Sequence, residues 1–287
     1  MSVEEKLAVQ LETIVLNKIS TDRLQLPAMP AMAAKCLDVV RRADFTTAEA
    51  TAVIEKDPSL AAQVLKVANS AAFATRQPAD TVQACVVRLG ASKLKTIIFE
   101  VATRQMFESK DPEIAASCQT MWQHSLAVAT LSRDLAVMVG GGEPESAYLA
   151  GLLHDVGKPI VATMLLDAEY AMAGRVARRW IERETWIAVV ERTHRRVGSA
   201  LTKKWQMPDL VTKAVVECED FDPANRVSIG NGVRFVNALC KKAGVYEGKV
   251  DAEENEALIM VGRSMIGISD ANFDRLEQQL RSGAFSA

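Results

Sequence analysis

Apolar residues recur along most of this chain at intervals of three and four positions, and no alternating run of apolar and polar residues is sustained. A period near 3.6 is typical of amphipathic helices, whereas alternation is typical of half-buried strands. Alanine and leucine, two strong helix formers, dominate the apolar set, and only 5% of the residues are aromatic. We therefore predict an all-α, multi-helix fold.

Proline, glycine and capping residues divide this pattern into short helices. Thr46 and Glu49 have the spacing of a capping box, and Asp57-Pro58 places an N-cap acceptor before a proline suited to the first helical turn. Gly90 separates two helices, and Lys110-Asp111-Pro112 is the best internal boundary, between an N-terminal helical part (1–110) and a helical core (111–287). The predicted helices are residues 4–18, 31–42, 46–56, 59–73, 81–89, 92–107, 112–139, 144–156, 159–173, 185–204, 209–217, 227–243, 253–266 and 270–281.

Composition excludes several classes of protein. The chain has 287 residues and a formal net charge of -2, which gives no general attraction to nucleic acid or to an anionic membrane. No uninterrupted apolar run reaches the roughly 18 residues of a membrane span, and the charged residues 1–6 contain no apolar signal core. We therefore expect a cytoplasmic protein with no membrane partner.

Cysteine usage agrees with a reducing compartment. The five cysteines are odd in number and scattered, with no C-x-x-C pair, which argues against a disulfide framework or a zinc ribbon. Each lies in an apolar helical context, where a free thiol acts as a small hydrophobic side chain. They are Cys36, Cys85, Cys118, Cys218 and Cys240.

The chain has only three histidines, and all three fall on apolar faces of predicted helices. His124 and His194 each lie within an apolar stripe at helical spacing, and His154 shares a face with small residues that permit close helix packing. Asp155 follows His154 directly. Inward imidazoles and a carboxylate are the ligands of a divalent metal site. The alternative is that each histidine is a hydrogen-bonded core residue.

Six blocks of the sequence resemble the HDOD family of bacterial signalling proteins, in the order of that family. The resemblance covers about residues 20–220. It is carried by Leu26–Pro30, Asp57–Phe73, Val86–Phe99, Met121–Ala129, Gly151–Lys158 (GLLHDVGK) and Glu191–Pro208. It implies an N-terminal helical subdomain packed on an HD-like helical core. HDOD domains are relatives of the HD-type metal-dependent phosphohydrolases that generally lack the full catalytic set.

The resemblance also implies which residues correspond to the metal ligands of the parent enzymes. His124 and the His154-Asp155 pair match three ligand positions, and the fourth, an aspartate in the parents, best matches Asn237, a neutral and weaker ligand. A further carboxylate is expected to come, if at all, from Asp220, Asp222 or Asp251. The dinuclear HD-GYP enzymes, which cleave cyclic di-GMP, need additional histidines that this chain does not have.

Three other residues are candidates for contacts with a ligand or a phosphate. They are Lys158, His194 and Glu191; the last two are spaced as in carboxylate-bridged metal sites, but a second such pair is absent. The alternative for Glu191 is a surface pair with Arg195. An arginine-rich stretch favours a solvated helix face over a nucleic-acid site: Arg175, Arg178, Arg179, Arg183, Arg192, Arg195 and Arg196.

Two functions from different classes follow from these residues and from the resemblance. The favoured one is a non-catalytic regulatory domain in signal transduction, with no cofactor, that binds a protein partner or a small ligand such as a nucleotide or cyclic dinucleotide. The alternative is a mononuclear phosphohydrolase that acts on a nucleotide or cyclic nucleotide. It would hold Mn, Fe, Ni or Zn on His124, His154 and Asp155, with Lys158 on a phosphate.

Overall fold

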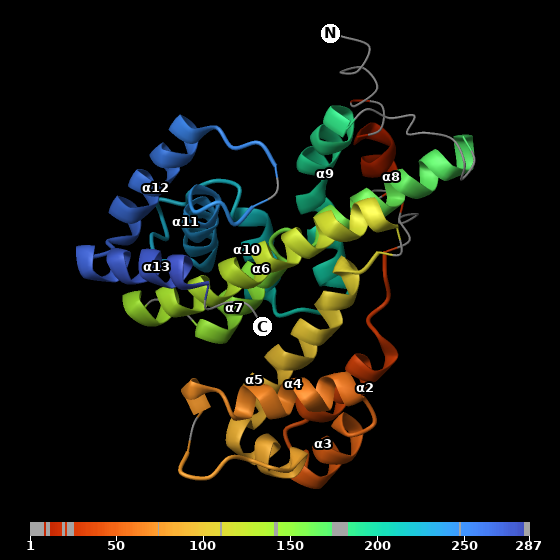
Figure 1. The fold of residues 1–287 in the computed structure, drawn as a ribbon, viewed down its shortest axis with the longest axis vertical. Coiled ribbons are helices and arrows are strands. Elements are labelled where there is room, and N and C mark those ends of the chain that lie inside the picture. The colour runs from red at the N-terminus through yellow and green to blue at the C-terminus, as the bar shows by residue number, and fades with distance from the viewer. Residues whose placement is uncertain are drawn as a thin grey trace. The chain divides into compact units, whose positions relative to one another are not determined.

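The computed structural model describes residues 9, 12–18, 21, 26–73, 75–109, 111–140, 143–173, 183–246 and 248–283. Over these residues the chain forms helices and no strand, which confirms the all-α prediction (Figure 1). The elements are α2 (Ala31–Arg41), α3 (Thr47–Ile54), α4 (Pro58–Ala68), η1 (Ala71–Phe73), α5 (Val82–Arg104), η2 (Gln105–Phe107), α6 (Pro112–Val139), α7 (Pro144–Leu153), α8 (Gly157–Ala173), α9 (Arg183–Lys204), α10 (Asp209–Glu217), α11 (Ile229–Lys242), α12 (Ala252–Ile266) and α13 (Asp270–Ser282).

The chain divides into two compact units. One is residues 28–105, with α2 to α5, and the other joins residues 1–27 to residues 106–287. Residues 26 and 27 belong to the second unit, where the Leu26 carbonyl accepts from Lys204 and the Pro27 carbonyl accepts from Trp205 at the end of α9. The division of the chain into domains at residue 110 stays a prediction, because compactness alone does not show which parts fold independently.

Local signals determine the helix starts in the smaller unit. The Thr46 side chain accepts from the Glu49 backbone while the Glu49 carboxylate accepts from the Thr46 backbone, so the predicted capping box is confirmed. Asp57 accepts from the Leu60 backbone at the start of α4. Gly90 adopts a φ of 69°, which favours glycine, and bends α5 where two separate helices were predicted.

Removal of the Asp57 cap tests how much this unit depends on it. We expect Asp57→Ala to lower the free energy of unfolding by about 1 kcal/mol, because the Leu60 amide loses its acceptor at the start of α4. Urea denaturation measures the change. Asp57→Asn keeps a side-chain acceptor, so its free energy of unfolding should fall by only a few tenths of the decrease expected for Asp57→Ala. An equal decrease for both variants would contradict the capping role.

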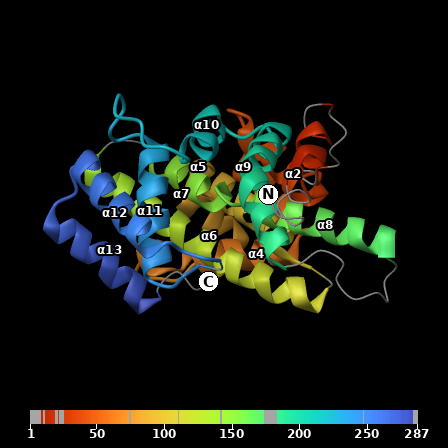
Figure 2. The same cartoon turned by 90° about the horizontal axis from the view of Figure 1, so that it is seen from above.

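The long helix α6 organises the larger unit. It packs against α7 and α11, while α8 packs against α9 and α12 lies beside α11 (Figure 2). The small residues predicted to permit close packing do so at Gly151, where a Cβ atom would come within 2.8 Å of the Ala129 Cα atom of α6. This close approach brings the end of α7 directly beside the middle of α6.

The predicted helix 144–156 is three residues too long. α7 ends at Leu153, residues 154–156 form a turn, and α8 begins at Gly157 rather than at residue 159. The segment Pro144–Asp167 has the length and composition of a membrane span, but 83% of its apolar window is buried inside the protein. Such burial is typical of a core helix, and the turn at 154–156 interrupts the segment.

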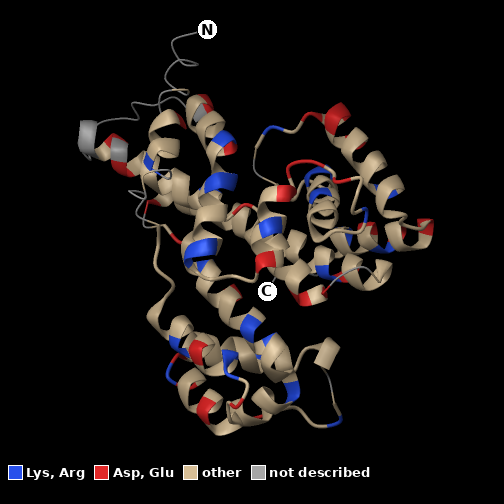
Figure 3. Cartoon of the chain, turned by 180° about the vertical axis from the view of Figure 1, so that it is seen from behind, with Lys and Arg blue, Asp and Glu red and all other residues tan. Residues whose placement is uncertain are grey.

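All five cysteines are buried. Lysine, arginine, aspartate and glutamate are mixed along the helices (Figure 3). Of the predicted helix 4–18, residues 12–18 are helical and residues 4–8, 10 and 11 lie outside the described residues, as do Arg175, Arg178 and Arg179 of the basic stretch.

Candidate metal centre

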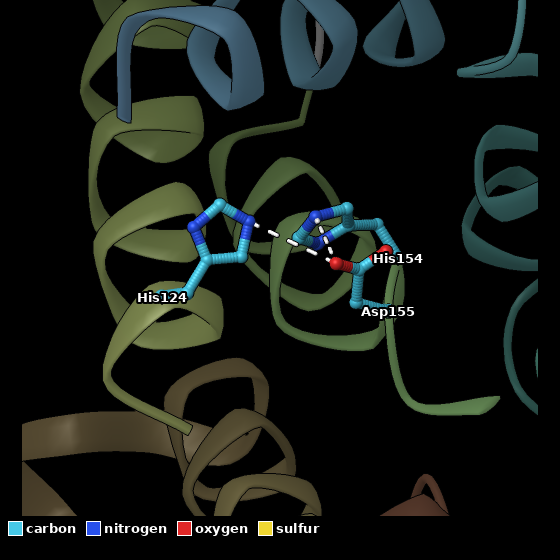
Figure 4. Close-up of side chains that lie close together, drawn as sticks. All are labelled: His124, His154 and Asp155. Carbon is cyan, nitrogen blue, oxygen red and sulfur yellow. Dashed lines mark ion pairs between the residues drawn. The ribbon is translucent and has the colours of Figure 1, made fainter. Parts of the chain in front are cut away.

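Four side chains from separate parts of the larger unit meet in its interior. His124 projects from α6, His154 and Asp155 from the turn after α7, and His194 from α9. None of the four is more than 3% exposed, so the predicted inward orientation of the three histidines is confirmed. Figure 4 shows the rings of His124 and His154 next to the carboxylate of Asp155, with both joined by dashed lines to the same oxygen.

The turn at 154–156 exists because His154 competes for the backbone of α7. Its Nδ1 atom lies 2.6 Å from the Gly151 carbonyl, one of the terminal carbonyls that the helix leaves without a partner. Val156 then donates to Leu153 and Lys158 to Asp155 with the shorter spacing of a tight turn. The next helix starts at Gly157, whose Cα is so close to the His194 backbone of α9 that a Cβ atom would overlap it.

The Asp155 carboxylate lies at the centre of these side chains. Its Oδ1 atom is 3.2 Å from His194 Nε2. Its Oδ2 atom is 2.9 Å from Lys158 Nζ, 3.5 Å from His154 Nε2 and 3.8 Å from His124 Nε2. One buried carboxylate therefore contacts all three histidines of the chain and one lysine.

The hydrogen-bond network assigns the protons of His124 and His154. His124 Nδ1 lies 2.6 Å from the Val245 carbonyl, and His154 Nδ1 makes the equally short contact with Gly151. A carbonyl only accepts, so each Nδ1 carries the proton and each neutral ring presents an unprotonated Nε2. Both Nε2 atoms are buried and have no hydrogen-bond partner among the described residues. Their lone pairs face Asp155.

This donor set fits a divalent metal in part. His124 Nε2, His154 Nε2 and an Asp155 carboxylate oxygen lie within 4.8 Å of one another, and two imidazole nitrogens with one carboxylate suit Mn, Fe, Ni or Zn. The backbone carbonyls that fix the two rings are the second-shell contacts that such ligands usually have. The three residues therefore fit a metal, although Lys158 already contacts the same carboxylate.

Lys158 is the cation of this centre. Its ammonium bridges the Oδ2 atom of Asp155 and the Oε1 atom of Glu191, at 2.9 and 2.8 Å. It also donates to the Tyr246 hydroxyl, which donates in turn to Glu191. The Lys158 side chain is 4% exposed and that of Glu191 is 40% exposed. The network therefore leads from the buried carboxylate to the surface.

The pKa values of the centre reflect burial and these contacts. Burial alone would raise the pKa of Asp155, but the Lys158 ammonium and the contact with His194 hold it well below its usual value. Burial would lower the pKa of Lys158, yet Asp155 and Glu191 raise it above its usual value. Burial lowers the pKa of His154 to about 3 and also lowers that of His124. At neutral pH the centre thus holds ionised Asp155 and Lys158 beside neutral His124 and His154.

These shifts predict loss of stability in mild acid. His124 and His154 stay neutral in the folded protein, whereas the unfolded chain takes up a proton at each below about pH 6.5. The contribution of His154 is therefore complete above pH 6.5 and is lost as the pH falls towards 3, by up to about 1.4 kcal/mol per pH unit, and the contribution of His124 is lost in the same direction. The contribution of Asp155 is lost only below its unfolded pKa of 3.8.

Urea denaturation between pH 4.5 and 7.5 measures this dependence. The variant His154→Gln cannot take up the proton, so its free energy of unfolding should fall less steeply with decreasing pH than that of the wild type. The difference between the two slopes should correspond to the uptake of about one proton on unfolding. Identical slopes for the two proteins would contradict the assigned protonation of His154.

The structure brings most of the candidate residues together. His124, His154, Asp155, Lys158, Glu191 and His194 form one connected cluster. The alternative pairing of Glu191 with Arg195 is wrong, since Glu191 binds Lys158 while Arg195 donates to the Cys218 sulfur. The reason is that Glu191 points from α9 towards the start of α8, where the buried Lys158 ammonium faces it.

No hydrogen bond or ion pair among the described residues joins Asn237 or the three alternative aspartates to this cluster. Asn237 is buried on α11, and its Oδ1 atom has no hydrogen-bond partner among the described residues. Its role as a fourth ligand stays a prediction. Asp220 pairs with Arg234, Asp222 accepts from the Ala224 backbone, and Asp251 caps α12. Each of these aspartates therefore has a local structural contact.

Tyr246 is a member of the cluster that the sequence did not predict. Its ring lies edge-on to His124 with centroids 5.2 Å apart, and the ammonium groups of Lys158 and Lys241 lie 4.8 and 4.6 Å from its centroid. Tyr246 and the Val245 carbonyl both come from the loop after α11, which thereby covers His124. The available signal was a tyrosine between Gly244 and Gly248, directly after the helix expected to carry the fourth ligand.

Solved structures of three bacterial proteins share this fold. A protein of Shewanella amazonensis, provisionally named a metal-dependent phosphohydrolase, is 24% identical, with a TM-score of 0.76 and 99% of both chains covered. An HDOD domain protein of unknown function from Geobacter sulfurreducens is 19% identical (TM-score 0.61; 96% and 99% covered). A protein of Marinobacter aquaeolei, provisionally named a signal transduction protein, is 21% identical (TM-score 0.59; 96% and 64% covered).

Sequence comparison identifies the family. An uncharacterized protein of Treponema pallidum is 22% identical over 218 residues, which make up 75% of this chain and 42% of that protein, so the chain spans less than half of this relative's length. The family model of the HDOD domain matches residues 26–221. This range is more than half of the chain and is close to the range of the resemblance, residues 20–220. The chain belongs to the HDOD domain family.

Proposed function

We propose that this chain is a non-catalytic HDOD signalling domain, which acts by binding a protein partner and uses the His-Asp centre to hold its helices together. One observation carries the proposal: the Asp155 carboxylate is enclosed by three imidazoles and the Lys158 ammonium, and none of these five side chains is more than 4% exposed. A carboxylate that takes part in hydrolysis must be accessible to substrate and water. The space around the Asp155 carboxylate is instead filled by side chains of α6, α8 and α9.

Further support comes from the charge balance of the centre. A buried carboxylate is costly unless it is paired, and the Lys158 ammonium at 2.9 Å already pairs with Asp155. The centre therefore needs no further cation to be stable. This balance accounts for a buried His-Asp pair in a chain whose fourth ligand position best matches Asn237 instead of an aspartate.

A hydrolysis assay with added Mn²⁺ tests the proposal. Purified protein should release no phosphate from nucleotides or phosphomonoesters and should leave cyclic dinucleotides intact, at the level of a matched Asp155→Asn preparation. Hydrolysis that requires Mn²⁺ and disappears in Asp155→Asn, while His154→Gln loses it too, would contradict the non-catalytic function.

A second candidate function is a mononuclear metal-dependent phosphohydrolase. It is favoured by the two unpartnered Nε2 atoms of His124 and His154, which face the Asp155 carboxylate. These three residues would hold the metal, and a bound metal would supply a polarised water and a contact for phosphate oxygens. The name given to the Shewanella protein points in the same direction.

Metal content separates the two candidates. Protein purified without chelator and supplemented with Mn, Fe, Ni or Zn should, on the second function, contain about one equivalent of metal after desalting. On the first function it should contain a small fraction of an equivalent. The variant Asp155→Asn is the control in both cases, because it removes the only carboxylate of the donor set.

A further inference from the structure

The position of Lys158 suggests a second role for this residue. Its ammonium lies 2.9 Å from Asp155 Oδ2, the carboxylate oxygen at 3.5 Å from His154 Nε2 and 3.8 Å from His124 Nε2. A divalent ion held by these three residues would therefore share one carboxylate oxygen with the ammonium group. Two cations in contact with one buried oxygen repel each other strongly, because the surroundings screen them little.

Lys158 also has an alternative acceptor within reach. Glu191 Oε1 lies 2.8 Å from the same nitrogen, on the side of the network that is open to solvent. The Tyr246 hydroxyl bridges the two, as an acceptor from Lys158 and a donor to Glu191. An ammonium that moved away from Asp155 would keep a carboxylate and a hydroxyl as partners.

We propose that Lys158 and a divalent metal ion are mutually exclusive partners of Asp155, and that Glu191 sets the balance by holding the Lys158 ammonium when the metal binds. The inference rests on the proposed charge-balanced centre and extends it. Lys158 is a specificity-determining residue that excludes the metal, and Glu191 is a positioning residue that acts through Lys158.

Titration with Mn²⁺ alone tests the exclusion by Lys158. The dissociation constant, read from the EPR signal of free Mn²⁺, should be lower in Lys158→Met than in the wild type by roughly tenfold or more, because the competing charge is gone. Lys241→Met is the matched control. It removes an ammonium that lies near the same Tyr246 ring but forms no ion pair with Asp155 among the described residues. It should change the constant less than threefold.

The role of Glu191 is tested by a double-mutant cycle. Glu191→Gln changes a side chain that is 40% exposed, so it should fold even if Lys158→Met does not. Alone, it should weaken Mn²⁺ binding several-fold, because Lys158 loses its alternative acceptor. In the Lys158→Met background it should have no effect, since the residue through which it acts is absent.

The outcomes separate this inference from the proposed function. Equal Mn²⁺ affinity in Lys158→Met and the wild type would overturn the exclusion, and an equal effect of Glu191→Gln in both backgrounds would overturn the positioning role. Neither result bears on hydrolysis, which the assay of phosphate release measures separately. If Lys158→Met is unfolded, unchanged or tighter Mn²⁺ binding by Glu191→Gln overturns the inference.

Discussion

Asp155→Asn is expected to lower the free energy of unfolding by about 3–5 kcal/mol, the usual cost of removing one partner from a buried ion pair. Asparagine has nearly the same shape as aspartate, so the decrease in the free energy of unfolding measures the contribution of the carboxylate charge. The Lys158 ammonium would keep Glu191 but lose the carboxylate at 2.9 Å, and the side chain is 4% exposed. Urea denaturation at pH 7 measures the change, with the wild type as reference.

Asp270→Asn is the matched control for this prediction. Asp270 also forms an ion pair, with Arg263, but the Asp270 side chain is 94% exposed. Exposed ion pairs contribute about 0–1 kcal/mol, so this variant should unfold nearly as the wild type does. A loss at Asp155 as small as that at Asp270 would mean that the enclosed carboxylate does not hold the centre together.

Gly157→Ala is expected to destabilise the protein by about 3 kcal/mol or more, or to prevent folding. The new Cβ atom would overlap the backbone of His194, which cannot move aside as a flexible side chain can. Separation of α8 from α9 would also pull Asp155 away from His194. Expression as soluble protein and denaturation in urea measure the effect.

Gly198→Ala, on the opposite side of the same contact, is the control for this variant. A Cβ atom at Gly198 would meet Val156 Cγ1 at 3.5 Å, an ordinary van der Waals contact. Alanine also favours a helix interior over glycine by about 1 kcal/mol, so this variant should be as stable as the wild type or more stable. Similar losses for the two variants would contradict the role of the close backbone approach at Gly157.

Features that depend on neighbouring residues could be predicted from the sequence. The capping box at Thr46 and the bounds of α10 follow from side chains and a proline within a few positions. The inward orientation of the histidines follows from the apolar stripe of each helix. The end of α7 was predicted three residues late, because the apolar period continues while the His154 ring takes the Gly151 carbonyl.

The partners of Lys158 could not be predicted because they are distant in sequence. Glu191 is separated from Lys158 by most of α8 and the first part of α9, and Tyr246 comes from a loop after α11. The motif GLLHDVGK indicates that a lysine follows the His-Asp pair but not whether it faces a phosphate or a carboxylate. Only the packing of α8 on α9 decides between these two.

The imidazole nitrogens test the central claim most directly, because all three histidines of the chain lie in this centre. In ¹⁵N-labelled protein without a histidine tag, His124 and His154 should show a protonated Nδ1 and an unprotonated Nε2 at pH 7. One equivalent of diamagnetic Zn²⁺ should leave both Nε2 signals in place, because Lys158 neutralises Asp155. A shift of both Nε2 signals with one equivalent of Zn²⁺ would contradict the structural role and make the centre a metal site.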